Sequence, residues 1–101
     1  MEVRRRDPGK ARKEAEIGDF YMRRENYAAA EARYREAAAW DPQWAEAHEK
    51  WAKALWELGR RKEAMEVCRD FLARNPASGG RKRVEKLLEK YEKKLAEGMG
   101  S

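Results

Sequence analysis

Apolar residues recur along most of the chain at intervals of three and four, the spacing that places side chains on one face of an α-helix. No segment alternates β-branched with polar residues as a strand would. Helices are expected over five stretches, namely residues 8–24, 27–40, 42–58, 62–74 and 81–96. The sequence therefore predicts an all-α fold of five helices.

Each expected helix has one inward face, and small residues are frequent on it. Gly18 is expected opposite Ala30, and Ala52 opposite Ala64, so that paired helices approach closely. The other inward positions are Ala11, Ala15, Ile17, Tyr21, Met22, Tyr34, Ala37, Ala47, Trp51, Leu55, Val67, Cys68, Phe71, Leu72, Val84, Leu87, Leu88, Tyr91 and Leu95. On the fifth helix, Lys82, Lys86, Lys90 and Lys94 form the opposite, outward row.

Proline and glycine mark the ends of the expected helices. Three pairs recur with a period of 34 residues: Asp7-Pro8, Asp41-Pro42 and Asn75-Pro76. Each pair is interpreted as an N-cap followed by a proline near the start of a helix. Glu25-Asn26 and Gly59 are expected to end helices, because Asn and Gly tolerate the left-handed conformation.

The period and the residues within it indicate a family. Residues 11–44 carry Glu14, Ile17, Gly18, Tyr21, Ala30, Tyr34 and Pro42, and residues 45–78 carry His48, Trp51, Ala52, Leu55, Ala64, Cys68 and Pro76, in the same phase. This joint pattern resembles tetratricopeptide repeat proteins over residues 8–96. The resemblance implies a right-handed α-solenoid of two helix-turn-helix repeats and a C-terminal capping helix.

The expected organisation follows from this phase. The segments are a basic lead (1–7), a first repeat (8–44), a second repeat (45–78), the capping helix (79–97) and a disordered tail or expression scar (98–101). Residues of the fifth helix fit the repeat only after a shift of two, so Gly79-Gly80 is interpreted as an insertion and a hinge. A capping helix of this kind would cover the apolar side of the last pair.

Composition limits the classes of function. Charged residues make up 43% of the 101 residues, too many for a membrane span, and no signal peptide is recognisable. The net charge is +5: residues 1–13 carry six bases and two acids, and residues 79–101 carry seven bases and four acids. Basic ends leave weak nucleic-acid binding as an alternative, although no basic stripe with interleaved aromatic residues is evident.

Candidates for catalysis are few. His48 is the only histidine, so neither a histidine-rich metal site nor a Ser-His-Asp triad can be built, and it is interpreted as a packing residue. Cys68 lies at an inward position and is interpreted as part of the core. No enzymatic activity, cofactor or metal is expected.

The resemblance also implies a binding surface, because the first helix of each repeat lines a concave groove. The matching residues are Arg12, Ala15, Asp19, Met22, Arg23, Glu46, Glu49, Lys53, Trp56, Glu57, Lys82, Glu85, Glu89, Glu92 and Lys93. They comprise seven acids and five bases, with Trp56 and Met22 as apolar contacts. The expected function is therefore a protein-interaction scaffold for a peptide or partner helix, basic and with an apolar anchor.

Several alternatives stay open. The regular period also suits a designed repeat protein without a natural ligand, and the exposed edges of the stack suit a homodimer. Some members of the family bind a C-terminal carboxylate with Lys and Asn residues of the groove. The matching positions here hold Ala15, Asp19 and Lys50, so this mode of binding is not expected. The stretch 17–27 is weakly similar to bacterial envelope lipoproteins of outer-membrane assembly. The expected location is the cytoplasm by default, or the bacterial envelope or periplasm.

Overall fold

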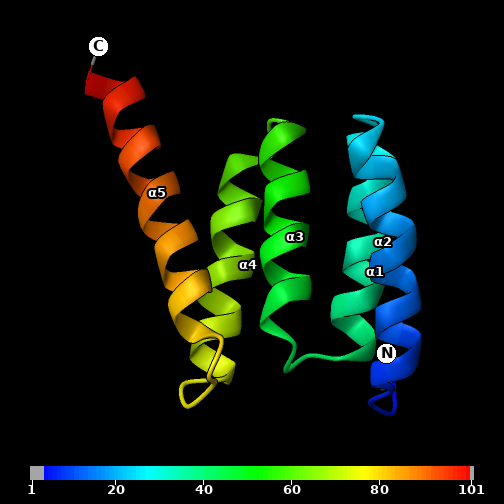
Figure 1. Cartoon of the computed structure of the whole chain (residues 1–101). Coiled ribbons are helices and arrows are strands. Elements are labelled where there is room, and N and C mark those ends of the chain that lie inside the picture. The colour runs from blue at the N-terminus through cyan, green and yellow to red at the C-terminus, as the bar shows by residue number, and fades with distance from the viewer. Residues whose placement is uncertain (1–3, 101) are drawn as a thin grey trace.

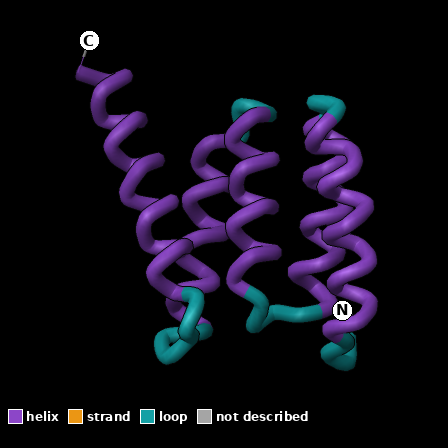
Figure 2. Tube along the Cα trace, viewed as in Figure 1, coloured by secondary structure: helices purple, strands orange, loops and turns teal. Residues whose placement is uncertain are grey.

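The computed structural model describes the backbone of residues 4–100 and the side chains up to Gly98. Over this range the chain forms helices joined by short loops, without strands (Figure 2). The helices are α1 (Pro8–Arg23), α2 (Tyr27–Trp40), α3 (Ala45–Glu57), α4 (Arg61–Arg74) and α5 (Arg81–Gly100). None of these described helices is long and apolar enough to cross a bilayer.

The helices are arranged as two antiparallel hairpins and one additional helix. α1 pairs with α2 and α3 pairs with α4, while α2 packs on α3 and α5 packs on α4 and α3. α1, α3 and α5 share one layer, with α2 and α4 behind them, and α1 and α5 form the two outer edges (Figure 1). The predicted α-solenoid of two helix pairs and a fifth helix is confirmed.

The two hairpins meet through small side chains. Ala47 of α3 packs with Ala15 and Ala37 of the first hairpin, and all three are at most 3% exposed. Ala54 packs in the same way with Ala30 and Tyr34 of α2. These alanines let α3 approach α2 closely, a contact between hairpins for which the sequence analysis made no prediction.

A second core lies between α3, α4 and α5. Leu55, Phe71, Val84 and Tyr91 are each at most 4% exposed and belong to one cluster. The apolar stripe predicted for α5 therefore packs against the second hairpin. Its outward lysine row, Lys82, Lys86, Lys90 and Lys94, is exposed as expected.

Gly18 lies directly against an aromatic ring of the partner helix α2. A Cβ atom at Gly18 would be 2.5 Å from Cε1 of Tyr34, and the three atoms nearest to it all belong to that ring. Ile17 is placed differently from the prediction, because it is 40% exposed. It lies on the outer side of α1, which no described helix covers.

The helix caps follow the sequence prediction only at the first proline. Asp7 caps α1, and its Oδ1 accepts a hydrogen bond from the Lys10 N–H at 3.1 Å. Asp41 instead ends α2, and its carboxylate accepts hydrogen bonds from Arg6 Nε at 2.9 Å and from the Gln43 N–H. α3 begins three residues after Pro42, so the predicted cap at Asp41-Pro42 is wrong.

The same correction applies to the second half of the chain. Asn75 ends α4, and its side chain donates to the Phe71 carbonyl at 3.1 Å. Pro76 lies in the loop before α5. The N-cap predicted at Asn75 is therefore wrong, because its side chain already closes the helix before it.

Both predicted helix ends in the hairpin loops exist, but one uses a different residue. Glu25, with φ of 58°, adopts the left-handed conformation that was assigned to Asn26. Asn26 caps α2 instead, since its Oδ1 accepts a hydrogen bond from the Ala29 N–H at 3.3 Å. Gly59, with φ of 81°, ends the α3 segment as predicted.

The ends of the chain also differ from the prediction. Gly98 and Gly100 belong to α5, so the tail expected from residue 98 onward is helical through Gly100; residue 101 lies outside the described residues. Of the predicted basic lead, residues 1–3 likewise lie outside. Its described part is fastened to α2, because the Asp7 N–H donates to the Trp40 carbonyl at 2.9 Å.

Gly80 is a packing contact, which argues against the predicted hinge. A Cβ atom there would be 2.5 Å from Cβ of Ala45, a buried residue at the start of α3. Glycine at this position therefore allows the chain entering α5 to lie close to α3. A Cβ atom at Gly79 would meet nothing within 4 Å, so Gly79 carries no such constraint.

We expect Gly18→Ala to lower the free energy of unfolding by about 1–3 kcal/mol, because the new methyl group overlaps the buried Tyr34 ring. Chemical denaturation followed by circular dichroism measures the change. The matched control is Gly98→Ala, where no atom lies within 4 Å of the new Cβ and helix propensity adds up to about 1 kcal/mol of stability. Equal effects of the two substitutions would contradict the close contact.

Candidate functional site

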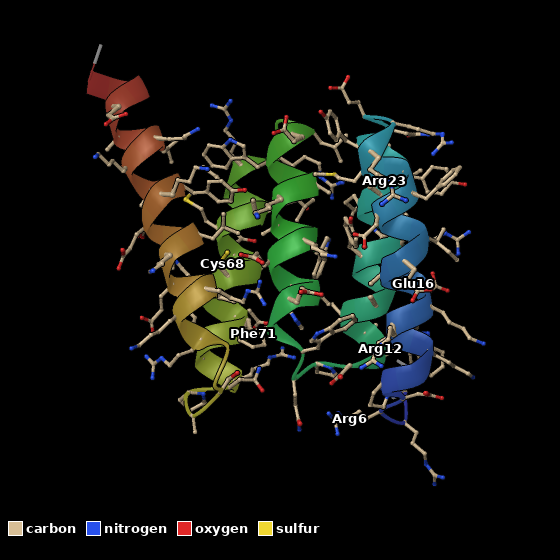
Figure 3. The ribbon with its side chains drawn as sticks, in the orientation of Figure 1. Arg6, Arg12, Glu16, Arg23, Cys68 and Phe71 are labelled. Atoms are coloured by element: carbon tan, nitrogen blue, oxygen red, sulfur yellow. The ribbon has the colours of Figure 1, made fainter. Side chains whose placement is uncertain are left out.

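The layer of α1, α3 and α5 presents one continuous face, called here the front face. Figure 3 is viewed onto this face, and Arg12, Glu16 and Arg23 project from α1 on it. Ion pairs join the three helices across it: Lys50 of α3 with Asp19 of α1, and Arg83 of α5 with Glu49 of α3. The residues predicted to line a groove therefore come from neighbouring helices of a single layer.

A pocket of about 240 Å³ lies between α1 and α3 on this face. Its lining residues are Asp19, Met22, Arg23, Tyr34, Lys50 and Lys53. Four of them (Asp19, Met22, Arg23 and Lys53) were predicted as groove residues from their positions in the repeat. Tyr34 and Lys50 were not, because the gap between α1 and α3 exposes part of α2 and turns the Lys50 side chain towards Asp19.

Asp19 connects three helices at the edge of the pocket. Its Oδ1 accepts a hydrogen bond from the Tyr34 hydroxyl at 2.6 Å, and Lys50 Nζ donates to Oδ1 at 2.9 Å and to Oδ2 at 3.0 Å. Burial, and then the hydrogen bond to Asp19, raises the pKa of Tyr34 above its ordinary value, so the phenol remains a donor. The Asp19 carboxylate is thus already neutralised by Lys50.

Cations dominate the rim of the pocket. The Arg23 side chain is exposed and forms no hydrogen bond or ion pair with the part of the chain that the structure describes. Lys53 is half exposed, and its Nζ lies 3.9 Å from the nearest carboxylate oxygen, on Glu49. Because Asp19 is paired, these two cations give the pocket an attraction for anionic groups.

The predicted acids lie mostly towards α5, where several are paired within the protein. Arg83 Nε is 3.2 Å from Glu49, and Arg83 Nη1 is 3.7 Å from Glu46. Two further predicted acids are also paired, Glu85 with Arg81 and Glu92 with Arg69. The excess of acids counted along the groove positions is therefore largely compensated by bases outside those positions.

Trp56 is not the open groove contact that the sequence predicted. It is 9% exposed, and its ring stacks on Tyr91 of α5 with ring centroids 3.9 Å apart. The Arg61 guanidinium carbon lies 4.7 Å from the Trp56 ring centroid. The indole therefore joins α3 to α5, and it is not available as an anchor for a ligand.

The chain thus contains the same helix hairpin twice, and the first helices of the two hairpins, α1 and α3, lie on the same face. A family model for the tetratricopeptide repeat matches residues 21–91, more than half of the chain. The chain belongs to the tetratricopeptide repeat family. No curated protein matches the chain significantly. The family generally acts as a protein–protein interaction module.

Besides the α1–α3 pocket, the chain has a second groove on the side opposite to the front face. A groove of about 750 Å³ lies between α2 and α4, and it includes His48, Trp51 and Phe71 among its lining residues. The indole Nε1 of Trp51 donates to Glu31 Oε2 at 2.8 Å. Glu31 is only 4% exposed, and it lies 3.7 Å from Arg60 as well. These contacts hold Trp51, which lines the groove, against α2. The groove therefore lies where the two hairpins meet.

The two residues considered for catalysis are both core residues of the repeats. The ring nitrogen Nδ1 of His48 lies 2.8 Å from the Trp44 carbonyl oxygen, and burial lowers the His48 pKa below its ordinary value. The Cys68 thiol is fully buried, and burial raises its pKa to about 12. A thiol in this environment is not activated as a nucleophile.

The two basic ends of the chain lie on opposite edges of the stack. Arg4 and Arg6 pair with Glu36 of α2 and with Asp41 at its end, and residues 8–13 begin α1, whereas the lysine row belongs to α5 at the other edge (Figure 1). They do not combine into one basic surface. Nucleic-acid binding by both ends together is therefore not favoured by this tetratricopeptide arrangement.

We expect the free energy of unfolding to fall as the pH is lowered from about 7 to about 5, with His48 as one cause. The unfolded histidine binds a proton near pH 6.5, whereas the buried folded side chain does so only at lower pH. Between these two values the unfolded chain binds more protons and is favoured. Comparing denaturation curves of the wild type and His48→Gln across this range isolates the contribution, and identical slopes would contradict it.

Proposed function

We infer that this tetratricopeptide domain is a non-enzymatic interaction module, and that its α1–α3 pocket binds an apolar side chain of a peptide with a carboxylate beside it. The observation that carries the inference is the pocket itself. Its wall includes the Tyr34 ring and the Met22 side chain, and Arg23 and Lys53 flank it. An apolar cavity with a cationic rim suits an apolar anchor next to an acidic group.

The pocket is preorganised by contacts that do not involve a ligand. Tyr34 is 2% exposed, and its hydroxyl is held by Asp19 at 2.6 Å. Lys50 holds the same carboxylate from α3. A wall fixed in this way loses little conformational entropy when a peptide binds, so more of the contact energy contributes to affinity.

This proposal changes the charge of the expected partner. The basic peptide predicted from the sequence followed from counting acids at groove positions, but Asp19, Glu46 and Glu49 are paired with cations of the protein. At the α1–α3 pocket the exposed charges are those of Arg23 and Lys53. A peptide that also carries basic residues would place them beyond this pocket, towards the acids of α5.

A fluorescein-labelled peptide with one leucine between two glutamates tests the proposal by fluorescence anisotropy. We expect Arg23→Ala and Lys53→Ala each to weaken binding by about three- to tenfold, because each removes a charged contact at a partly exposed site. Met22→Ala should also weaken binding, because it removes apolar contact area.

Lys86→Ala on the outward row of α5 is the matched control, and it should leave the affinity unchanged. A peptide with lysines in place of the glutamates should bind more weakly than the original. No detectable binding of the glutamate peptide, or a preference for the lysine peptide, would contradict the proposed ligand chemistry.

A further inference from the structure

The outer edge of α1 carries an apolar contact surface of its own. Ile17 is 40% exposed and Phe20 is 42% exposed, and no other large hydrophobic side chain in the described residues is as exposed. They lie one helical turn apart on the side of α1 that faces away from α2 and α3. The pair is separate from the α1–α3 pocket, to which neither residue contributes.

The internal repeat shows what this side of the helix does elsewhere in the chain. The period of 34 residues places Ile17 at the position of Trp51 and Phe20 at the position of Ala54. In α3 the residues at these two positions contact α2. Ala54 packs with buried residues of α2, and Trp51 donates a hydrogen bond to Glu31 of α2. The exposed pair on α1 therefore occupies the positions that bind a helix in the second hairpin.

Ile17 and Phe20 have charged neighbours where Trp51 and Ala54 of α3 have apolar ones. Lys13 stands at the position of Ala47, which is 0% exposed in the contact between hairpins. Lys10 stands at the position of Trp44. A helix as apolar as α2 would have to bury Lys13 without a partner, which is unfavourable. An alanine-rich helix that packs as α2 packs on α3 is therefore disfavoured at the outer edge of α1.

A third cation lies at the other end of the pair. The Arg24 guanidinium carbon is 3.6 Å from the Phe20 ring centroid, and Arg24 Nη1 donates to the Phe20 carbonyl oxygen at 3.4 Å. Ile17 and Phe20 are thus flanked by Lys13 on one side and by Arg24 on the other, whereas Lys10 Nζ lies 4.5 Å from the centroid of the Trp40 ring of α2. Glu16 is the nearby acid, and it projects onto the front face (Figure 3).

We propose that the outer edge of α1 docks an acidic amphipathic helix of another protein. Apolar side chains of that helix cover Ile17 and Phe20, and its carboxylates pair with Lys13 and Arg24. The contact between α2 and α3 provides the precedent within the chain. There a carboxylate on the docking helix, Glu31, accepts hydrogen bonds from Trp51 of the receiving helix and from Arg35.

A second copy of the chain fits this edge poorly. The opposite edge of the stack exposes the four lysines of α5, so end-to-end stacking brings two basic surfaces together. Two α1 edges facing each other also bring Lys13 and Arg24 close to cations of the other copy. Charge repulsion of this kind favours an acidic partner over self-association.

The probe is a synthetic helical peptide with leucines at every third and fourth position and glutamates on both sides of them. We expect it to bind the wild-type protein in isothermal titration calorimetry and to bind more weakly as salt is added. Phe20→Ser should weaken binding about tenfold by removing apolar contact area. Lys13→Glu should weaken it about fivefold and improve binding of the matching lysine peptide.

Lys86→Glu, a charge reversal on the exposed row of α5, is the control and should leave affinity for the glutamate peptide unchanged. Circular dichroism confirms that each variant is folded, which is expected because Phe20 and Lys13 are exposed. Equal binding of the glutamate and lysine peptides, or no effect of Phe20→Ser, would overturn the proposal.

Two further results distinguish the possible occupants. Loss of binding in Arg23→Ala with full binding in Phe20→Ser would place the helix in the α1–α3 pocket, which overturns this inference and leaves the proposed function intact. A concentration-dependent dimer in light scattering that Phe20→Ser abolishes would show a second copy at this edge, and would likewise overturn it.

Discussion

Close packing of α2 against α3 joins the two hairpins, and it depends on four alanines at the centre of the contact. Ala30 and Ala37 of α2 meet Ala54 and Ala47 of α3, and all four are fully buried. A larger side chain at any of them would push the hairpins apart. The hydrogen bond from Trp51 to Glu31 adds a directional contact between the same two helices.

The front face inherits its geometry from this contact. α1 and α3 touch each other much less than either touches α2, so α2 sets the distance between them. The remaining gap is crossed by the bond between Lys50 and Asp19, and beside that bond it leaves the α1–α3 pocket. The geometry of the α1–α3 pocket is thus a consequence of how the two hairpins pack.

The two edge helices, α1 and α5, differ in the side chains on their outer sides. α5 covers the second hairpin with Val84, Leu87 and Tyr91, and its outer side is lysine-rich. None of the described helices covers the outer side of α1, and there it combines Ile17 and Phe20 with cations. The two edges of the stack, α1 and α5, are therefore chemically different.

The spacing of apolar residues predicted the five helices, and the resemblance to tetratricopeptide repeats implied the two hairpins and the additional fifth helix. Contacts between distant residues account for most of the errors. Asp41 looked like an N-cap, but Arg6 uses its carboxylate. Trp56 had a groove position in the repeat, but Tyr91 of α5 covers it. Such contacts depend on three-dimensional packing, which a local pattern does not specify.

The repeat phase and the pairing of charges contribute differently to the α1–α3 pocket. Asp19, Met22, Arg23 and Lys53 do converge, because the repeat phase alone determines which side of a first helix faces its neighbour. The net charge of the site depends on which ions pair, and Lys50 neutralises Asp19 from another helix. Counting charges along the sequence therefore missed that Asp19 is paired, which is why the peptide proposed for this pocket differs in charge from the one expected from the sequence.

Amide chemical-shift mapping with the leucine–glutamate peptide tests the central claim most directly, because it locates the ligand without any substitution in the protein. The account predicts that shifts concentrate on residues 19–23 of α1 and 50–53 of α3, with Tyr34 of α2 included. Shifts centred instead on Trp51 and Phe71, in the groove between α2 and α4, would contradict the account.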